Sequence, residues 1–175
     1  MIVHIATGSN LGARIDHLDR ADVALAALGP VLRVSPTYET AAVGMAPGTP
    51  PFLNRVVEME IDSDQCTPAQ LMECLLDIER RMGRTRASGL VASRCIDLDI
   101  VLWGLQQLDL PTLTVPHPRM LERRFVLQPL CDLVPDQVIP GTGGLTVSQL
   151  LTALPEEVPQ IAPWPQQAAF PTATS

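Results

Sequence analysis

The chain has 175 residues, 46% of them apolar and 18% charged, and its formal net charge is −7. A chain of this length and composition buries a core without needing disulfides or a structural metal, which excludes wholesale disorder. The acidic balance and the shortage of aromatic residues argue against nucleic acid or an anionic membrane as a partner. No apolar run is long enough to span a membrane, and the N-terminus lacks the pattern of a signal peptide. We therefore expect a cytoplasmic protein with reduced cysteines, and a monomer.

The predicted elements of the first half of the chain, in order, are strand 2–7, turn 8–12, helix 13–28, strand 31–38, loop 40–51 and strand 53–61. Those of the second half are a helix from the N-cap Thr67 to about Gly83, loop 84–94, strand 95–103, a mostly loop segment 108–118 and helix 119–131. This β-α-β-β-α-β order, followed by a helix, predicts an α+β, ferredoxin-like fold: an antiparallel sheet with helices on one face, plus a C-terminal helix. We expect one domain over residues 1–154 and a Pro-rich, poorly ordered tail over 155–175.

The cations are all arginine and are concentrated in two segments. Five lie within residues 80–94, which contain no acidic residue, and three lie within residues 119–124. In an acidic protein this distribution favours a small anionic ligand, with a solvated arginine face as the alternative.

The clearest chemical signal is the strand segment IDLDI at residues 96–100. Side chains alternate along a strand, so Asp97 and Asp99 share one face at a separation of about 6.6 Å. Two neighbouring carboxylates repel, and a divalent cation such as Mg²⁺ relieves that repulsion. The alternative is a pair of ordinary acids facing solvent.

Arginines precede this carboxylate pair. Arg84 and Arg94 bound the loop that leads into the strand, and guanidinium groups bind phosphate oxygens in bidentate fashion. A metal-binding carboxylate pair beside a cationic loop is what phosphoryl transfer requires, because that chemistry depends on charge neutralisation and alignment. The alternative is that these arginines only solvate the loop.

Other residues add weaker signals. His117 lies between two prolines and has reach to a phosphate or a base edge, although a turn-filling histidine fits equally well. Phe52 and Asn54 present a ring and an amide to a planar heterocycle, or else serve as core and cap. The Gly8–Gly12 turn lacks both the lysine of a phosphate loop and the spacing of a dinucleotide-binding loop, so we interpret it as structural.

Taken in order, the segments ATGSNLG, PTYETAAVG, PFLN, IERRMGRTR, RCIDLDI and VPHPRMLERRFVLQPL resemble the 6-hydroxymethyl-7,8-dihydropterin pyrophosphokinases of folate biosynthesis. The resemblance covers about residues 3–150. It implies a ferredoxin-like fold and transfer of the pyrophosphoryl group of ATP to the hydroxymethyl oxygen of a reduced pterin, with release of AMP. It also implies two Mg²⁺ ions held by Asp97 and Asp99, and small-molecule partners only.

The resemblance also assigns residues to each substrate. It implies that Arg84 and Arg94 bind phosphates and stabilise developing charge on a loop that closes over the reactants. The residues that it places at ATP are Glu79, Arg84, Arg94, Thr114, His117 and Arg123. Those that it places at the pterin are Thr40, Val43, Phe52, Asn54 and Phe125, with the two phenylalanine rings enclosing the pterin.

One segment departs from the family. Residues 87–93 lack the tryptophan and the Gly-Pro turn that many members carry before the arginine of this motif. An alternative is therefore a weakly active or inactive paralogue that binds pterin or nucleotide. A nucleic-acid-binding module of the same fold is a third hypothesis, which the acidic balance opposes.

Overall fold

The computed structural model describes residues 1–42, 44–84 and 93–165. Its main sheet has the strand order β5-β1-β4-β3-β8, with β2 also paired to β4, and every pairing is antiparallel. The strands are β1 (Ile2–Ser9), β2 (Val31–Val34), β3 (Tyr38–Thr40), β4 (Phe52–Glu60), β5 (Asp97–Trp103) and β8 (Ile161–Pro163). A separate hairpin consists of β6 (Leu108–Leu110) and β7 (Leu113–Val115).

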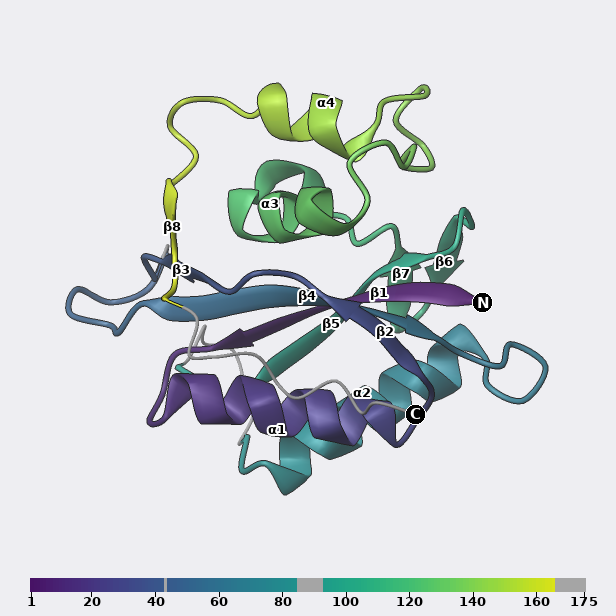
Figure 1. Cartoon of the computed structure of the whole chain (residues 1–175), viewed down its shortest axis with the longest axis horizontal. Coiled ribbons are helices and arrows are strands. Elements are labelled where there is room, and N and C mark those ends of the chain that lie inside the picture. The colour runs from purple at the N-terminus through teal and green to yellow at the C-terminus, as the bar shows by residue number, and fades with distance from the viewer. Residues whose placement is uncertain (43, 85–92, 166–175) are drawn as a thin grey trace.

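Helices pack on both faces of this sheet (Figure 1). The α1 helix (Arg14–Ala26) and the α2 helix (Pro68–Arg81) cover one face, and α3 (Arg124–Leu133) and α4 (Val147–Thr152) lie over the other. The α2 helix begins at the predicted N-cap Thr67, whose hydroxyl accepts the Gln70 N–H while the Gln70 side chain accepts the Thr67 N–H. The predicted ferredoxin-like arrangement is confirmed, and the C-terminal helix supplies the second helical face.

Strand alternation divides the core into two clusters. Val3 and Ile5 of β1 and Leu98 of β5 point toward α1 and α2, while Val56 of β4 and Val101 of β5 point toward α3. All five are buried. Because β5 alternates in this way, Asp97 and Asp99 fall on the sheet face where α3 packs.

Three predicted elements differ from the structure. The single strand over 31–38 is wrong: it divides into β2 and β3 around Pro36, which has no N–H for a strand ladder. The helix over 119–131 begins as a 3-10 turn at Met120–Glu122 and continues as α3 to Leu133. The segment 108–118, predicted as mostly loop, contains the β6–β7 hairpin.

The C-terminal part also contains elements that the sequence did not predict. The α4 helix starts at Thr146 with the same type of capping box as α2. Strand β8 lies within the segment predicted to be a poorly ordered tail, and it pairs with β3. No helix in the described part of the chain is long and apolar enough to cross a membrane.

Candidate active site

The two aspartates lie where β5 runs beside the end of β1. Asp97 is opposite Gly8 and Asp99 is opposite Ala6 in the strand register. Both side chains are partly exposed, whereas Leu98 between them is fully buried. The predicted alternation is therefore confirmed, and both carboxylates lie on one face of the strand.

Asp97 is held by both predicted arginines. The Arg94 guanidinium donates to Asp97 Oδ2 at 2.9 Å, and the Arg84 guanidinium donates to Asp97 Oδ1. Arg84 also pairs with Glu79. Arg84 and Arg94 are mostly buried, with side-chain exposures of 14% and 20%, so solvent screens these ion pairs weakly. The alternative of two arginines that only solvate a loop does not fit this placement.

Glu79 projects from α2 into the interior and is 1% exposed. Its Oε1 accepts the backbone N–H of Leu98 at 2.8 Å and also pairs with Arg84. Leu98 is the residue between the two aspartates, so this carboxylate fixes both the start of β5 and one of the arginines. Sequence reasoning placed Glu79 at ATP. In the structure its described contacts are with the Leu98 N–H, between the two aspartates, and with Arg84.

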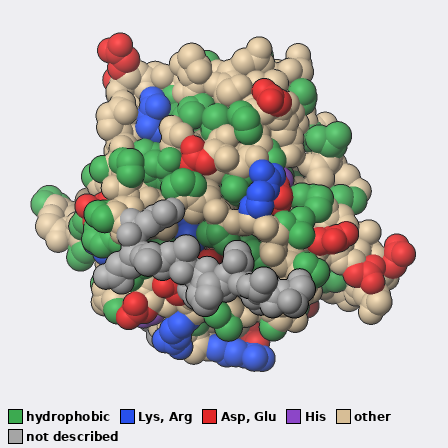
Figure 2. Space-filling view, in the orientation of Figure 1, with side chains coloured by type: hydrophobic (Ala, Val, Ile, Leu, Met, Phe, Trp, Pro, Cys, Tyr) green, Lys and Arg blue, Asp and Glu red, His purple; other side chains and the backbone are tan. Residues whose placement is uncertain are grey.

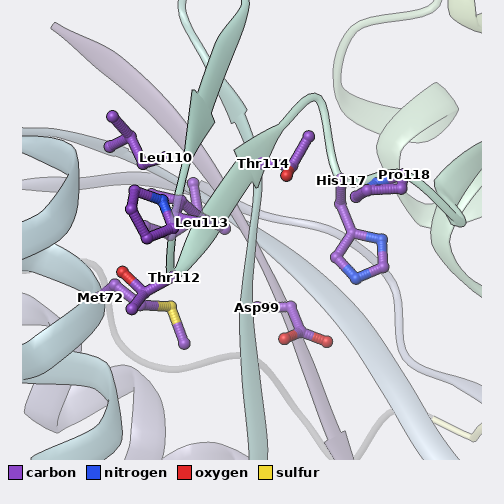
Figure 3. Close-up of a pocket in the computed structure, with 10 residues that line it drawn as sticks. Met72, Asp99, Leu110, Thr112, Leu113, Thr114, His117 and Pro118 are labelled. Atoms are coloured by element: carbon purple, nitrogen blue, oxygen red, sulfur yellow. The ribbon is translucent and has the colours of Figure 1, made fainter.

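Asp99 faces a pocket of about 280 Å³ between β5 and the β6–β7 hairpin. Figure 3 shows its carboxylate on the side where the ring of His117 lies, with Thr114 on the neighbouring strand. Burial, together with the Asp97 carboxylate, raises the pKa of Asp99. Burial lowers the pKa of His117, and Asp99 opposes that shift. His117 Nδ1 accepts the Arg119 N–H at 3.2 Å, so a neutral ring carries its proton on Nε2.

The pocket also has apolar walls that the sequence did not predict. The local sequence carried little signal for the hairpin, because Pro111 and Thr112 are not among the residue pairs that mark a tight hairpin turn. These additional lining residues are Met72, Ile100, Leu110, Pro111, Thr112, Leu113 and Pro118. A shallow pocket with apolar walls and one carboxylate suits a flat, partly polar ligand.

Arg123 and Phe125 enter the site from the start of α3. The Arg123 guanidinium lies 5.4 Å from the centre of the Phe125 ring. Burial lowers the pKa of Arg123, and the nearby Arg119 adds to the effect while Asp99 opposes it. Arg123 therefore forms part of the same electrostatic cluster as the carboxylate pair.

The residues predicted to hold a heterocycle lie on β3 and β4, across β1 from the aspartates. The Asn54 side-chain amide donates to Thr40 Oγ1 at 2.9 Å, and both residues are buried. The Phe52 ring lies 5.7 Å from the Arg94 guanidinium, which also contacts Asp97. Arg94 thus connects the two halves of the site. Val43, predicted for the same half, lies outside the described residues.

Asn10 is a functional candidate that sequence reasoning missed. It is 1% exposed. Its side-chain Oδ1 accepts the backbone N–H of Arg94 at 2.7 Å, and its backbone N–H donates to the Arg94 carbonyl at 3.1 Å. Its amide nitrogen donates to Ser93 Oγ and to the Pro50 carbonyl. Through Asn10, the turn at residues 8–12 fixes the backbone of Arg94. An asparagine offers both a donor and an acceptor in one side chain, which was the available signal.

Opposite charges adjoin at this face. Figure 2 shows arginine side chains beside histidine and carboxylate atoms near the middle of the view. Within the described residues no group of three or more His, Cys, Asp or Glu side chains forms a metal cluster.

Comparison with known proteins agrees with this arrangement. Residues 4–135 match the family model described as 7,8-dihydro-6-hydroxymethylpterin-pyrophosphokinase (HPPK). A 2-amino-4-hydroxy-6-hydroxymethyldihydropteridine pyrophosphokinase of Synechocystis sp. is 37% identical over 92% of this chain and 78% of its own length. The Pseudomonas aeruginosa protein of the same name is 39% identical over 89% of this chain and 93% of its own length.

Longer proteins also contain the same domain. The chain spans 21% of the length of the Pneumocystis carinii folic acid synthesis protein fol1, at 36% identity. The solved Plasmodium falciparum HPPK-DHPS structure with SDX-DHP superposes with a TM-score of 0.62 at 14% identity, over 86% of this chain and 43% of that one, and it supports the fold alone. None of these proteins favours the inactive paralogue over the enzyme. The chain belongs to the 7,8-dihydro-6-hydroxymethylpterin-pyrophosphokinase family.

Proposed function

We propose that the face formed by Asp97, Asp99, Arg84 and Arg94 is where this chain carries out its family's reaction. As a member of the pyrophosphokinase family, the chain is an ATP-dependent transferase of folate biosynthesis. It moves the pyrophosphoryl group of ATP to the hydroxymethyl group of 6-hydroxymethyl-7,8-dihydropterin and leaves AMP. The observation that carries the site assignment is the convergence of both arginines on Asp97, two residues from the pocket-facing Asp99.

The two carboxylates fit a divalent cation with oxygen ligands. Burial and the neighbouring Asp97 carboxylate raise the pKa of Asp99. A bound cation would favour the charged form of Asp99 and so oppose this shift. Two protein carboxylates leave the other coordination positions to phosphate oxygens and water, as Mg²⁺ prefers. Two Mg²⁺ ions held by Asp97 and Asp99 would neutralise the phosphate charge and keep the reacting oxygens in line.

Arg84 and Arg94 have two roles in this proposal. Both oxygens of Asp97 accept hydrogen bonds from them, so a cation at Asp97 competes with at least one guanidinium. A guanidinium released from Asp97 would be free to bind two phosphate oxygens of ATP with its planar fork. Asn10 and Glu79 keep the two arginines beside the carboxylate during this exchange.

The substrates occupy the two sides of the carboxylate pair. The pocket with Thr114 and His117 accepts the nucleotide of ATP, and Arg123 contributes charge at its phosphate end. The Thr40–Asn54 pair and the rings of Phe52 and Phe125 receive the pterin. Asn54 offers an amide that both donates and accepts, which matches the edge of a pterin ring. The strand register supports this assignment, since Gly8 is the partner of both Asn54 and Asp97, and a pterin on the Asn54 side would direct its hydroxymethyl group toward Asp97.

Phosphorus NMR of the protein with ATP, Mg²⁺ and 6-hydroxymethyl-7,8-dihydropterin tests the proposal. We expect AMP and a pterin diphosphate from the wild type. Asp97→Ala and Asp99→Ala should each lower turnover at least about a hundredfold, because each removes a cation ligand.

The matched control is Asp136→Ala, which removes an exposed carboxylate outside the site and should keep normal turnover. Circular dichroism verifies that all three variants fold. Turnover near that of the wild type in either active-site variant would refute the metal assignment. Pterin binding by the wild type without AMP would instead support the inactive paralogue.

A further inference from the structure

The C-terminal strand lies against the half of the site assigned to the pterin. Strand β8 pairs with β3 so that Ile161 is opposite Thr40 and Pro163 is opposite Tyr38. On its other side β3 pairs with β4, where Thr40 is opposite Phe52. The three-residue strand that carries Thr40 is thus enclosed between β4 and the C-terminal segment (Figure 1).

The side chain of Arg14, at the start of α1, ties this segment to the site. Its guanidinium donates to the Pro51 carbonyl at 2.7 Å and pairs with Glu39 Oε2 at 2.8 Å. The same guanidinium lies 5.0 Å from the centre of the Trp164 ring. Trp164 follows β8 directly, and its backbone N–H donates to the Thr37 carbonyl at 2.8 Å. Arg14 is only 18% exposed, so these contacts are partly shielded from water.

These contacts reach both ends of the long connection between β3 and β4. Glu39 precedes Thr40, where the connection begins, and Pro51 precedes Phe52, where it ends. One guanidinium therefore contacts both flanks, and the Trp164 ring packs against it. The Asn54–Thr40 hydrogen bond of 2.9 Å requires that the two flanks keep a fixed spacing.

We propose that Trp164 and Arg14 are positioning residues for the pterin half of the site. The inference rests on the proposed function, because it assigns the pterin to Thr40, Phe52 and Asn54. The ring contact and the hydrogen bond that Trp164 makes are with Arg14 and Thr37, and neither of these residues is assigned to ATP or to the cations. Its loss should therefore weaken pterin binding selectively, by letting Arg14 and the two flanks move.

The size of the effect follows from the contact. An arginine over a tryptophan face is stabilising, and more so when it is partly desolvated, as Arg14 is. Loss of such a contact at a substrate-positioning element corresponds to a change in affinity of roughly threefold to thirtyfold.

The experiment compares Trp164→Ala, Trp164→Phe, Arg14→Ala and the control Leu105→Ala, which removes an apolar side chain that is 70% exposed. Steady-state kinetics give kcat and the KM for each substrate. Calorimetry gives the pterin Kd in the presence of a non-hydrolysable ATP analogue and Mg²⁺, and thermal unfolding reports the fold. Trp164→Ala keeps the backbone hydrogen bond to Thr37, so it isolates the ring.

We expect Trp164→Ala and Arg14→Ala to raise the KM and Kd for the pterin about threefold to thirtyfold, with the KM for ATP within twofold of wild type. Trp164→Phe retains a ring under Arg14 and should restore most of the affinity. An unchanged pterin Kd, or an equal loss for both substrates that follows a lower Tm, would overturn the inference.

The wild type distinguishes this failure from failure of the proposed function. If the wild type binds the pterin but forms no AMP, the function is wrong and the variants still test the positioning role through Kd. If the wild type does not bind the pterin at all, both the function and the inference are overturned.

Discussion

The carboxylate of Asp97 is shared by two guanidinium groups that approach it from different segments. Arg84 follows α2, and Arg94 precedes β5. The Asp97 carboxylate therefore binds one arginine from each side of the segment that joins these two elements. Arginine suits this position because its planar fork moves between a carboxylate and a phosphate without a change of geometry. A lysine at either position would supply a charge but only a single point of contact.

The carboxylate pair was predictable from the sequence, because strand alternation fixes which side chains share a face. Glu79 was harder, because its partner Leu98 lies 19 residues along the chain. A signal existed nonetheless: Glu79 follows Leu75 by four residues, so it lies on the apolar stripe of α2. An acid on a stripe that faces the core requires a buried partner. Arg14 gave no such signal, because its partners are known only once the strands are paired.

A different carboxylate, Asp22 in α1, gives the stability of the fold a pH dependence. Burial raises the pKa of Asp22 to about 6, although its ion pair with Arg55 at 2.7 Å opposes the shift. Between about pH 4 and pH 6, Asp22 therefore holds a proton in the folded chain that it has released in the unfolded chain, where its pKa is near 3.8. The stabilisation is complete at low pH and is lost as the pH rises from about 4 through 6, by up to about 3 kcal/mol.

Asp22→Asn should remove this dependence, because an amide does not titrate. Urea unfolding of both proteins at intervals from pH 4 to pH 7 measures it. We expect the free energy of unfolding of the variant to gain on that of the wild type by about 1–3 kcal/mol over this range. Parallel curves would contradict the assignment. Arg55 keeps its second partner, Asp19, in both proteins.

At the scale of elements, the site depends on how closely β1, β4 and β5 approach one another. Gly8 of β1 lies between Asn54 of β4 and Asp97 of β5. A methyl group on Gly8 would lie 3.0 Å from Asn54 Oδ1, which is tighter than most such contacts, so the Asn54 amide would have to shift. The glycine therefore lets the two halves of the site approach across a single strand.

Gly8→Ala should displace the Asn54 amide and lower kcat/KM for the pterin about tenfold, since a displaced donor no longer meets the ring edge. Gly8 does not have a positive φ, so the substitution adds no backbone strain. The KM for ATP and the Tm should change little. Kinetics with each substrate varied in turn measure the split. A large fall in Tm with equal losses for both substrates would show that the residue is only structural.

Elements with strong periodicity were predictable, and those set by pairing were not. The α2 helix follows from its apolar stripe, and its start follows from Thr67 and Pro68. Beside Pro36, Ser35 is held against Val56 of β4 where β2 and β3 divide: its N–H donates to the Val56 carbonyl and its Oγ accepts the Val56 N–H, each at 2.9 Å. Such contacts with a distant strand leave no trace in local sequence.

At the scale of the whole molecule, a polar network that is buried at His4 and Glu58 and exposed at Arg33 ties the second helical face to the sheet. The Arg33 guanidinium of β2 pairs with Glu58 at 2.7 Å and donates to the Leu133 carbonyl at 2.8 Å, at the end of α3. Glu58 also contacts His4 Nε2 at 3.1 Å. Burial lowers the pKa of His4, so the neutral ring donates from Nε2 to the carboxylate. The network fixes the C-terminal end of α3 against the sheet. Arg123 and Phe125 lie at the other end of this helix, so the network helps to position them beside the carboxylate pair.

The position of β8 has a further consequence for the behaviour of the protein in solution. Without this strand, β3 would present unpaired N–H and C=O groups, which other chains can extend into an intermolecular sheet. A chain ending after Gln160 should therefore self-associate as its concentration rises, whereas one ending after Pro165 keeps β8 and should stay dispersed. Light scattering over a concentration series compares the two, and equal scattering would contradict the idea. By pairing with β3, strand β8 thus protects the molecule against aggregation.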